Sequence, residues 1–318
     1  MIAARIERRG EPPRPTELPQ PQAPPGHALL RVHAAGLNPV DLAVAGGRFY
    51  LAVPEPPYVP GAEAVGEVIA AAGLPPGARA WGLCLTGAFA EVVAVPEERL
   101  VPVPDGVPDE AAIVAGIAGL AGWMAVRERG ALAPGERVVV LGAGGVVGQV
   151  AIQAARAGGA GAVVGVARSP GGRDRAVGAG ADAALEPSAP DLGAALRKAA
   201  GGAVDLVVDG LWGPAAAAAV GAMAPRARLV QVGNSMSPTA ELPGGPLRGG
   251  RLDLRGFSVF SEAGEAVARS YAQLASALGA GTLAVPVASG GLGEAAELWR
   301  RQAAGAEGVK LVLRPPPG

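Results

Sequence analysis

A run of valines that leads directly into a glycine-rich turn constrains this chain more than any other feature of its sequence. The strand-like segment Arg137–Leu141 is followed by Gly142, Gly145 and Gly148, and then by the helix-like stretch QVAIQAARA. A strand, a glycine turn and a helix in this order form the phosphate-binding corner of dinucleotide-binding folds. Gly142 permits the tight turn, Gly145 lets the backbone approach a pyrophosphate, and Gly148 lets the helix pack closely on the strand. The segment therefore predicts a doubly wound α/β domain that binds a dinucleotide.

The glycine spacing is GxxGxxG, because Val147 occupies the sixth position of the more common GxGxxG pattern. Since the chain contains 50 glycines in 318 residues, this spacing alone carries little information. Its position between a β-branched strand and a helix makes it specific. We expect the N–H groups of Val146 and Val147, at the start of the helix, to face the phosphates, because the helix dipole also favours an anion there.

The chain divides into two kinds of pattern. Residues 1 to about 105 alternate short apolar runs with turns rich in proline and glycine, which is typical of strands joined by turns. From about residue 110, β-branched runs alternate with helix-length stretches, which is the pattern of βαβ units and a parallel sheet. Further buried strands are expected at Ala162–Ala167, Ala183–Leu185, Val204–Asp209, Arg228–Val232 and Leu252–Phe257. The predicted architecture is α/β, with a β-rich substrate domain of residues 1–112 that residues 261–318 rejoin, and a nucleotide domain of residues 113–260 between them.

Composition and charge argue against several classes of protein. The chain carries 27 basic and 28 acidic side chains, so its net charge of -1 argues against a nucleic-acid binder or a membrane-surface protein. One cysteine, Cys84, and two histidines can form neither an internal disulfide nor a four-ligand zinc cage of cysteines and histidines.

The apolar runs Ala111–Val126 and Val138–Ala155 are too short or too interrupted for a membrane span of about 20 apolar residues, so we expect them in a soluble core. The N-terminus is charged and lacks the apolar block of a secretory signal, which predicts a cytoplasmic protein.

The segment AVVGVARSP carries the residues that choose between the two pyridine dinucleotides. An acid at the end of this second strand hydrogen-bonds the ribose of NAD, whereas an arginine accommodates the 2′-phosphate of NADP. Arg168 stands at this position with Arg173 nearby, and no acid lies between Arg156 and Asp174. We therefore expect NADPH as the coenzyme. The alternative is that the two arginines only solvate a surface loop.

Ordered motifs over nearly the whole chain resemble one family of enzymes. They are AAGLNPVDLAVAGG, VPGAEAVGEV, PGARAWG, GAFAEVVAVP, AGLAGWMAV, PGERVVVLGAGGVVGQVAIQAARA, LVQVGN and LRGFS, between residues 34 and 258. In this order they are similar to the zinc-independent quinone oxidoreductase branch, the zeta-crystallin-like branch, of the medium-chain dehydrogenase/reductases. The resemblance implies a Rossmann dinucleotide-binding domain, a GroES-like substrate domain and a homodimer. We expect coenzyme and substrate in the cleft between the two domains, because ligand pockets often form at such places.

The zinc-dependent relatives differ from this chain at their metal ligands. They carry a cysteine in the segment that corresponds to GLNPVD and a histidine in the segment that corresponds to PGAEAVG. This chain has Asn38 and Ala62 there, and it lacks the four-cysteine lobe that holds a structural zinc. Asp41 and Glu63 are present without a metal to serve, and we expect them to form hydrogen bonds within the domain. The resemblance therefore implies an oxidoreductase that works without a metal ion.

Hydride transfer without a metal requires an acceptor that is already electrophilic, such as a quinone or an α,β-unsaturated carbonyl. The protein then has to stabilise negative charge on the acceptor oxygen and let a proton arrive. The amide of Asn38 is the first candidate donor, and Tyr50 is the second, as a proton donor or a pocket wall. The family places a tyrosine eleven residues after the asparagine, but this chain has Phe49 there. A turn-forming role for Asn38 before Pro39 and a purely structural role for Tyr50 are the alternatives.

Two further segments are candidates for coenzyme contacts. Gly233, Asn234 and Ser235 follow the apolar run RLVQV, where a parallel strand would end at the ligand-binding edge of the sheet. The resemblance implies that this loop approaches the nicotinamide end of the coenzyme, and an ordinary strand-terminating turn is the alternative. Lys310, in GVKLVLRP, resembles a family position near the coenzyme cleft, and a solvated strand residue is the alternative.

The predicted function is NADPH-dependent reduction of a quinone or an enone, a small-molecule substrate. Reduction of an enoyl thioester by the same fold is the first alternative, and non-catalytic NADPH binding by an interaction protein is the second. The missing family tyrosine supports the second alternative. The chain has no Tyr-x-x-x-Lys motif of a short-chain dehydrogenase, and no GxSxG motif with a downstream histidine of a serine hydrolase.

Overall fold

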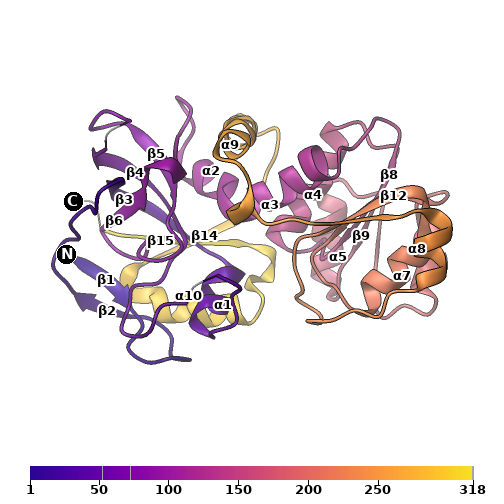
Figure 1. Ribbon diagram of the computed structural model, residues 1–318, viewed down its shortest axis with the longest axis horizontal. Coiled ribbons are helices and arrows are strands. Elements are labelled where there is room, and N and C mark those ends of the chain that lie inside the picture. Colours follow the sequence, from indigo (N-terminus) through magenta and orange to yellow (C-terminus); the bar gives the residue numbers. More distant parts are fainter. Residues whose placement is uncertain (52, 72, 317–318) are drawn as a thin grey trace. The chain divides into compact units, whose positions relative to one another are not determined.

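The computed structural model describes residues 1–51, 53–71 and 73–316, and it contains two compact units (Figure 1). Unit 1 comprises Met1–Ile117, Ala263–Thr282 and Pro286–Gly318, and unit 2 comprises Ala118–Glu262 and Leu283–Val285. Unit 1 is thus assembled from three separate stretches of the chain.

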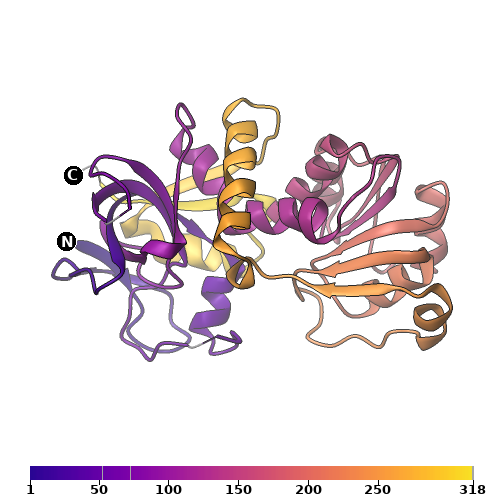
Figure 2. The same cartoon turned by 45° about the horizontal axis from the view of Figure 1, so that its top comes forward.

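Unit 2 is built around a parallel six-stranded sheet with the order β10-β9-β8-β11-β12-β13 (Figure 2). The reversal of strand order between β8 and β11 is the switch point of a doubly wound fold. The strands are β8 (Arg137–Leu141), β9 (Ala162–Val166), β10 (Ala183–Leu185), β11 (Val204–Asp209), β12 (Met223–Gln231) and β13 (Asp253–Gly256). The helices of this unit are α3 (Leu120–Met124), α4 (Val146–Ala157), α5 (Pro170–Gly178), α6 (Leu192–Ala199), α7 (Pro214–Ala222) and α8 (Gly244–Gly250). The α/β class predicted from the sequence is confirmed.

The central strands of this sheet are apolar in their middle parts, because helices cover both faces. Val138, Val139 and Val140 of β8 are all buried, and leucines of α6 and alanines of α7 pack against one face of the sheet. Three strands, β8, β10 and β11, begin and end at the residues that the sequence predicts. In contrast, β12 begins at Met223 rather than at Arg228, and a register shift between β11 and β12 accommodates the additional pairing.

Unit 1 contains a seven-stranded sheet with the order β14-β15-β3-β4-β5-β7, in which β6 also pairs with β3. β14 and β15 run parallel, and the other pairs are antiparallel. The strands are β3 (His27–Leu37), β4 (Glu63–Ala70), β5 (Arg79–Leu83), β6 (Val92–Pro96), β7 (Leu100–Pro102), β14 (Val287–Gly291) and β15 (Lys310–Arg314), and a separate ribbon pairs β1 (Ile2–Arg5) with β2 (Arg14–Glu17). The helices are α1 (Pro39–Ala45), α2 (Asp109–Val114), α9 (Gly264–Gly279) and α10 (Ala295–Ala303). The C-terminal strand therefore lies inside a sheet that is otherwise formed mainly by the N-terminal part of the chain.

The boundaries between the units differ by a few residues from those that the sequence predicts. The first prediction places the change after residue 112, whereas the structure places it between Ile117 and Ala118, at a break in a helical stretch. The structure also assigns Leu283–Val285 to unit 2. The reason is that the Gln153 side chain donates to the carbonyl of Ala284 and accepts from its N–H, each at 2.9 Å.

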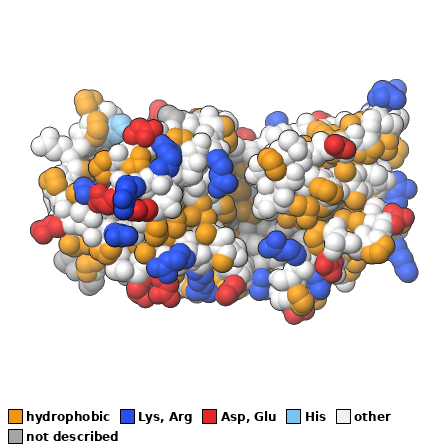
Figure 3. Space-filling view, turned by 90° about the horizontal axis from the view of Figure 1, so that it is seen from below, with side chains coloured by type: hydrophobic (Ala, Val, Ile, Leu, Met, Phe, Trp, Pro, Cys, Tyr) orange, Lys and Arg blue, Asp and Glu red, His pale blue; other side chains and the backbone are white. Residues whose placement is uncertain are grey.

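The helical stretch Asp109–Arg129 is long and apolar enough to cross a membrane by composition, but 78% of its most apolar window is buried inside the protein. It contains the run Ala111–Val126, which the sequence places in a core rather than in a membrane. On the surface, basic and acidic side chains are interspersed over the face shown in Figure 3. This mixture agrees with the net charge of -1.

Candidate functional site

The glycine turn of unit 2 joins β8 to α4 in the conformation that the motif predicts. Gly142 has a φ of 87°, which L side chains rarely adopt, and α4 begins at Val146 with Gly145 as its N-cap. A Cβ atom at Gly148 would collide with the carbonyl oxygen of Gly142, so this glycine lets the helix pack on the turn. Gly145 is exposed, and the nearest atom to a Cβ there would lie 3.6 Å away. The turn and the N-terminal amides of α4, including those of Val146 and Val147, therefore leave an accessible surface for an anion.

A second helix, α5, packs on this glycine turn. A Cβ atom at Gly144 would lie 2.6 Å from the Cα of Gly172, so the two backbones are in close contact. Arg175 of α5 donates from Nε to the carbonyl oxygen of Gly144 at 3.1 Å, and its guanidinium lies over the first turn of α5. The sequence motifs do not single out Arg175. Its only signal is that a second arginine stands two residues after Arg173 in a glycine-rich segment.

The two arginines that the sequence singles out have different surroundings. Arg173 donates from Nη1 to the carbonyls of Ala167 and Arg168 at 3.2 and 2.8 Å, and it lies 4.0 Å from Glu186 Oε2. Its guanidinium therefore satisfies two backbone carbonyls just after β9. The Arg168 side chain is exposed and forms no hydrogen bond or ion pair within residues 1–51, 53–71 and 73–316. Of these two arginines, Arg168 is the one left available for a ligand.

The loop that follows β12 is attached to the loop that follows β11. Gly233 donates its N–H to the carbonyl of Asp209 at 3.2 Å, and Ser235 Oγ donates to the carbonyl of Gly210 at 2.8 Å. Asn234 is exposed at the tip of this loop. It lines a cavity of about 300 Å³ at the carboxyl ends of β12 and β13, together with Trp212, Gln231 and Arg255 among others. The loop thus lies at the edge of the sheet where α/β folds bind ligands.

Asp209, at the carboxyl end of β11, holds the neighbouring turn. Its Oδ1 accepts from the N–H groups of Leu211 and Trp212 at 2.8 and 2.9 Å, and Trp212 has a left-handed φ of 61°. The side chain is fully buried, and burial raises the pKa of its carboxyl group. Asp209 therefore fixes an unusual backbone conformation beside the cavity.

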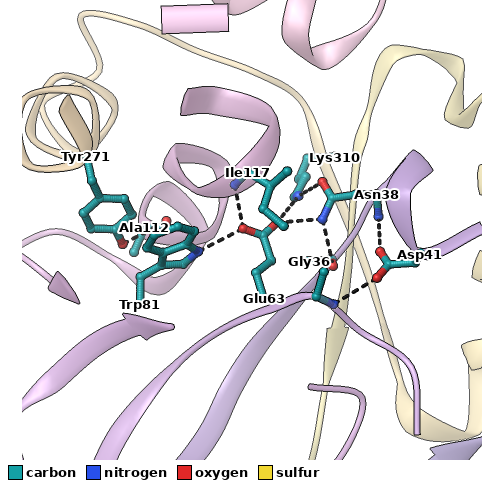
Figure 4. A network of polar contacts seen from close by, with 10 residues as sticks. Gly36, Asn38, Asp41, Glu63, Trp81, Ala112, Ile117, Tyr271 and Lys310 are labelled. Atoms are coloured by element: carbon teal, nitrogen blue, oxygen red, sulfur yellow. Dashed lines mark hydrogen bonds and ion pairs between the residues drawn. The ribbon is translucent and has the colours of Figure 1, made fainter. Parts of the chain in front are cut away.

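Unit 1 contains a buried cluster of polar side chains around Glu63 (Figure 4). Oε1 of Glu63 accepts from Asn38 Nδ2 at 2.8 Å and from Lys310 Nζ at 2.6 Å. Oε2 accepts from Trp81 Nε1 at 2.9 Å and from the N–H of Ile117 at 2.7 Å. The side chains of Glu63 and Lys310 are 0% and 1% exposed. The expectation that Glu63 forms hydrogen bonds within its domain is confirmed.

The side-chain amide of Asn38 forms hydrogen bonds within the same cluster. Its Nδ2 donates to the carbonyl of Gly36 at 3.2 Å and to Glu63, while its Oδ1 accepts from Lys310 Nζ at 2.7 Å. The predicted donation from Asn38 to a substrate oxygen therefore has no free N–H in this structure, and the side chain is 1% exposed. Lys310 is likewise not at a surface where it would meet a coenzyme, because its ammonium group is buried against Glu63. Motifs alone do not reveal that these residues bind one another.

Asp41 lies next to this cluster at the start of α1. Its Oδ2 accepts from the N–H of Asn38 at 2.7 Å, and its Oδ1 accepts from the N–H of Ala62 at 2.9 Å, as expected for a residue that bonds within its domain. Burial raises the pKa of Asp41 from 3.8 to about 7, and the nearby negative charge of Glu63 adds to this effect. The N–H of Asn38 acts in the opposite direction.

Tyr50 is on the surface of unit 1, with 65% of the residue exposed. Its ring lies 4.5 Å from the ring of Phe49, centroid to centroid. Tyr50 is therefore a surface residue, whereas Asn38 is buried. Tyr271 is a different case, because it is buried, stacks on Trp81 at 5.1 Å and donates to the carbonyl of Ala112 at 3.0 Å.

The described residues contain no group of three or more His, Cys, Asp or Glu side chains arranged to hold a metal ion. The lone pairs of Glu63 that face this cluster are taken by four donors, and the Lys310 ammonium already supplies a positive charge there. Cys84 is half-buried, with its Sγ 3.4 Å from the carbonyl of Gly61, and burial raises the pKa of its thiol. These residues do not fit a catalytic zinc ion.

Comparisons with known proteins match both units. A model of the zinc-binding dehydrogenase family matches residues 146–278, and a model of the alcohol dehydrogenase GroES-like domain matches residues 24–105. Among solved structures, a probable oxidoreductase from Mycobacterium abscessus is 30% identical, with a TM-score of 0.86 and 99% of each chain covered. The quinone oxidoreductase from Thermus thermophilus, also solved in complex with NADPH, is 31% identical, with a TM-score of 0.80 over 99% of this chain and 100% of that chain.

Curated relatives cover a smaller part of the chain. Prostaglandin reductase-3 from Bos taurus is 30% identical over 222 residues, which are 68% of this chain and 58% of that protein. The chain thus spans less than two thirds of the length of this relative. The two family models, the full-length structural likeness and the glycine turn of unit 2 agree. The chain belongs to the medium-chain dehydrogenase/reductase superfamily.

Proposed function

We propose that this protein is an NADPH-dependent oxidoreductase that reduces a quinone or an α,β-unsaturated carbonyl without a metal ion. The observation that carries the proposal is the Glu63 cluster, in which an ammonium group and three neutral donors surround the carboxylate. A zinc ion would be repelled by Lys310 and would find no set of ligands among the described residues. Without a Lewis acid, the acceptor itself must be electrophilic.

The glycine turn of unit 2 supports the coenzyme part of the proposal. The accessible amides of Val146 and Val147 would hold the pyrophosphate, and the loop Gly233–Ser235 would face the nicotinamide end. NADPH, when bound, supplies the hydride. The Thermus thermophilus relative was solved with NADPH, which supports the same coenzyme here. For the proton, Tyr50 is the proposed donor, because this residue is 65% exposed whereas Asn38 is buried.

The decisive experiment separates binding from turnover. NADPH binding is measured by fluorescence titration, and NADPH oxidation is then followed with quinones, enones and an enoyl thioester in the absence of added metal. Turnover with a quinone or an enone that survives treatment with a chelator supports the proposal. Tight binding without turnover of any acceptor would identify a non-catalytic NADPH-binding protein, and turnover of the thioester alone would identify the alternative reductase.

Coenzyme preference gives a prediction about individual arginines. Arg168 is exposed, and Arg175 has no ion pair within the described residues and touches the glycine turn, so both can meet a 2′-phosphate. Arg168→Ala and Arg175→Ala are each expected to lower the ratio of kcat/KM for NADPH over NADH by about tenfold, the loss of one charge-assisted contact. Initial rates with both coenzymes test this. Arg173→Ala is the control and is expected to leave the ratio within about twofold, because Nη1 of Arg173 donates to two carbonyls and lies 4.0 Å from Glu186 Oε2. An unchanged ratio in both test variants would remove these arginines from the phosphate site.

A homodimer is the second part of the proposal, and the edge strand β13 supports it. β13 is the last strand of the unit 2 sheet, and Leu254 at its centre is 39% exposed. Antiparallel pairing of two copies about Leu254 would place Asp253 of one chain opposite Arg255 of the other, which is favourable for cross-strand pairs. The working protein is then a dimer in the cytoplasm that acts on a small molecule, with neither nucleic acid nor membrane as its partner.

Leu254→Glu tests this interface, because it would place two carboxylates opposite each other at the two-fold axis. We expect the variant to sediment as a monomer at concentrations where the unchanged protein sediments as a dimer. Val177→Glu introduces the same charge at an exposed position of α5 and is expected to leave the dimer intact. A monomeric parent protein, or a dimeric Leu254→Glu variant, would contradict the proposed interface.

A further inference from the structure

The helical stretch that leads from unit 1 into unit 2 is broken at Gly116, where ψ is -142°. Ile117 follows the break, and its N–H donates to Glu63 Oε2 at 2.7 Å. An acceptor at this place is what a helix N-terminus needs, because its first amides lack intrahelical partners. We infer that Glu63, 54 residues away in the sequence, is a remote N-cap for the helical stretch that resumes at Ile117.

The space around the carboxylate is shaped for this contact (Figure 4). A Cβ atom at Gly116 would collide with Glu63 Oε2 and would lie 2.6 Å from Trp81 Nε1. A Cβ atom at Gly36 would collide with the other carboxylate oxygen and would lie 2.7 Å from Lys310 Nζ. Two glycines therefore let the carboxylate reach the helix break while the cluster stays closed to solvent.

Lys310 stabilises the ionised form of this buried cap. Its ammonium lies 2.6 Å from Glu63 Oε1, whereas Ile117 contacts the other carboxylate oxygen. An anion near the start of a helix is also favoured by the helix dipole. The ion pair and the cap thus use different oxygens of the same side chain.

The capped stretch continues into a helix that supports the glycine turn. Within unit 2, a Cβ atom at Gly122 of α3 would collide with the carbonyl of Val147 and would lie 2.9 Å from the N–H nitrogen of Ala151, both on α4. The two helices therefore touch through their backbones. Glu63 and Lys310 are positioning residues for the backbone at the break, and the packing of α3 on α4 is a separate contact within unit 2. This inference concerns the chain connection and does not depend on the proposed reaction.

Two neutral double variants separate the cap from the charge. In Glu63→Gln/Lys310→Met, the Gln carbonyl can accept from Trp81 and Ile117. Its NH₂ then takes the position of Oε1, and the Asn38 amide has to rotate so that its oxygen accepts from this group. In Glu63→Leu/Lys310→Met, the volume is similar but Ile117 has no acceptor. Both variants lack the buried ion pair. The Leu side chain also leaves Trp81 Nε1 and Asn38 Nδ2 without this acceptor, so exchange at amides away from the break has to report that wider loss.

Hydrogen exchange at single amides provides the readout. Labelling with ¹⁵N-isoleucine gives a small set of resolved signals, because the sequence contains only Ile2, Ile6, Ile69, Ile113, Ile117 and Ile152. Ile113 lies before the break in α2, and Ile152 lies in α4. They report general loosening of the same helical stretch and of unit 2, respectively.

We expect Ile117 to exchange at least about tenfold faster in the Leu/Met variant than in the Gln/Met variant, with Ile152 changed by less than about twofold. Equal exchange at Ile117 in the two variants would overturn the inference, and so would acceleration of all three amides together. Should the Leu/Met variant fail to fold, Glu63→Asp is the second test. It keeps the charge for Lys310 but shortens the side chain, so it is expected to accelerate exchange at Ile117, and an unchanged rate would equally overturn the inference.

Discussion

Replacing Lys310 by Met is expected to lower the free energy of unfolding by about 3–5 kcal/mol. The side chain is 1% exposed, and its ammonium is the cation that lies 2.6 Å from the fully buried carboxylate of Glu63. Removing it leaves that charge surrounded by neutral donors alone, and an uncompensated buried charge is among the most destabilising defects a fold can carry. Chemical denaturation followed by circular dichroism measures the effect.

The chain offers a matched control, because Lys198 is its other lysine and is exposed on α6. Lys198→Met removes the same group and is expected to change stability by less than about 0.5 kcal/mol. Adding Glu63→Gln to Lys310→Met is expected to restore a large part of the loss, because it removes the orphaned charge. A loss below about 1 kcal/mol for Lys310→Met, or no recovery in the double variant, would show that the ion pair does not stabilise the fold in this way.

Asp41→Asn is expected to abolish a pH dependence of stability. The pKa of Asp41 is raised from 3.8 to about 7 in the folded protein, chiefly by burial. Between these values the folded chain holds a proton that the unfolded chain has released, so stability falls as the pH rises from about 4 to about 7. A rise of about three in pKa corresponds to roughly 4 kcal/mol. Below about pH 4 and above about pH 7 the contribution no longer changes.

The measurement is the difference in unfolding free energy between the unchanged protein and Asp41→Asn at several pH values. This difference is expected to fall by roughly 3–4 kcal/mol from about pH 4 to about pH 8, because the variant has no carboxyl group to titrate at this position. Asp105→Asn, at an exposed position, controls for the loss of one acid anywhere in the chain. A difference that stays constant with pH would show that Asp41 is ionised throughout.

The parts of the fold that depend on neighbouring residues along the chain follow from the sequence. The strand β8, the glycine turn and the start of α4 at Val146 are all where the motif places them, because local backbone geometry and burial dictate these residues. The same holds for β10 and β11, which are short apolar runs between turns. The boundary near Ile117 is less predictable, because a single glycine breaks a continuous apolar helix there.

The site is only partly predictable, because its contacts join residues far apart in the sequence. Lys310 donates to Asn38, which lies 272 positions away in the sequence, and no pattern in either segment predicts this contact. The motifs therefore suggest a ligand role for each residue, whereas its actual partner is another side chain. Arg175 shows the reverse case, since only the packing of α5 on Gly144 distinguishes it from Arg173. Motifs identify which residues carry chemistry, but packing decides which of them face outward.

Because β15 pairs with β3 in the sheet of unit 1, one part of this unit is synthesised before unit 2 and another part after it. The sheet of unit 2 is complete at Gly256, so its folding can proceed while later codons are still being read. Before β15 (Lys310–Arg314) is synthesised, residues Ala35–Leu37 of β3 lack the strand with which they pair in the folded protein. Glu63 also lacks the Lys310 ammonium group that lies against it. A transcript truncated before codon 310 would yield a nascent chain with both defects, a natural target for quality-control proteases.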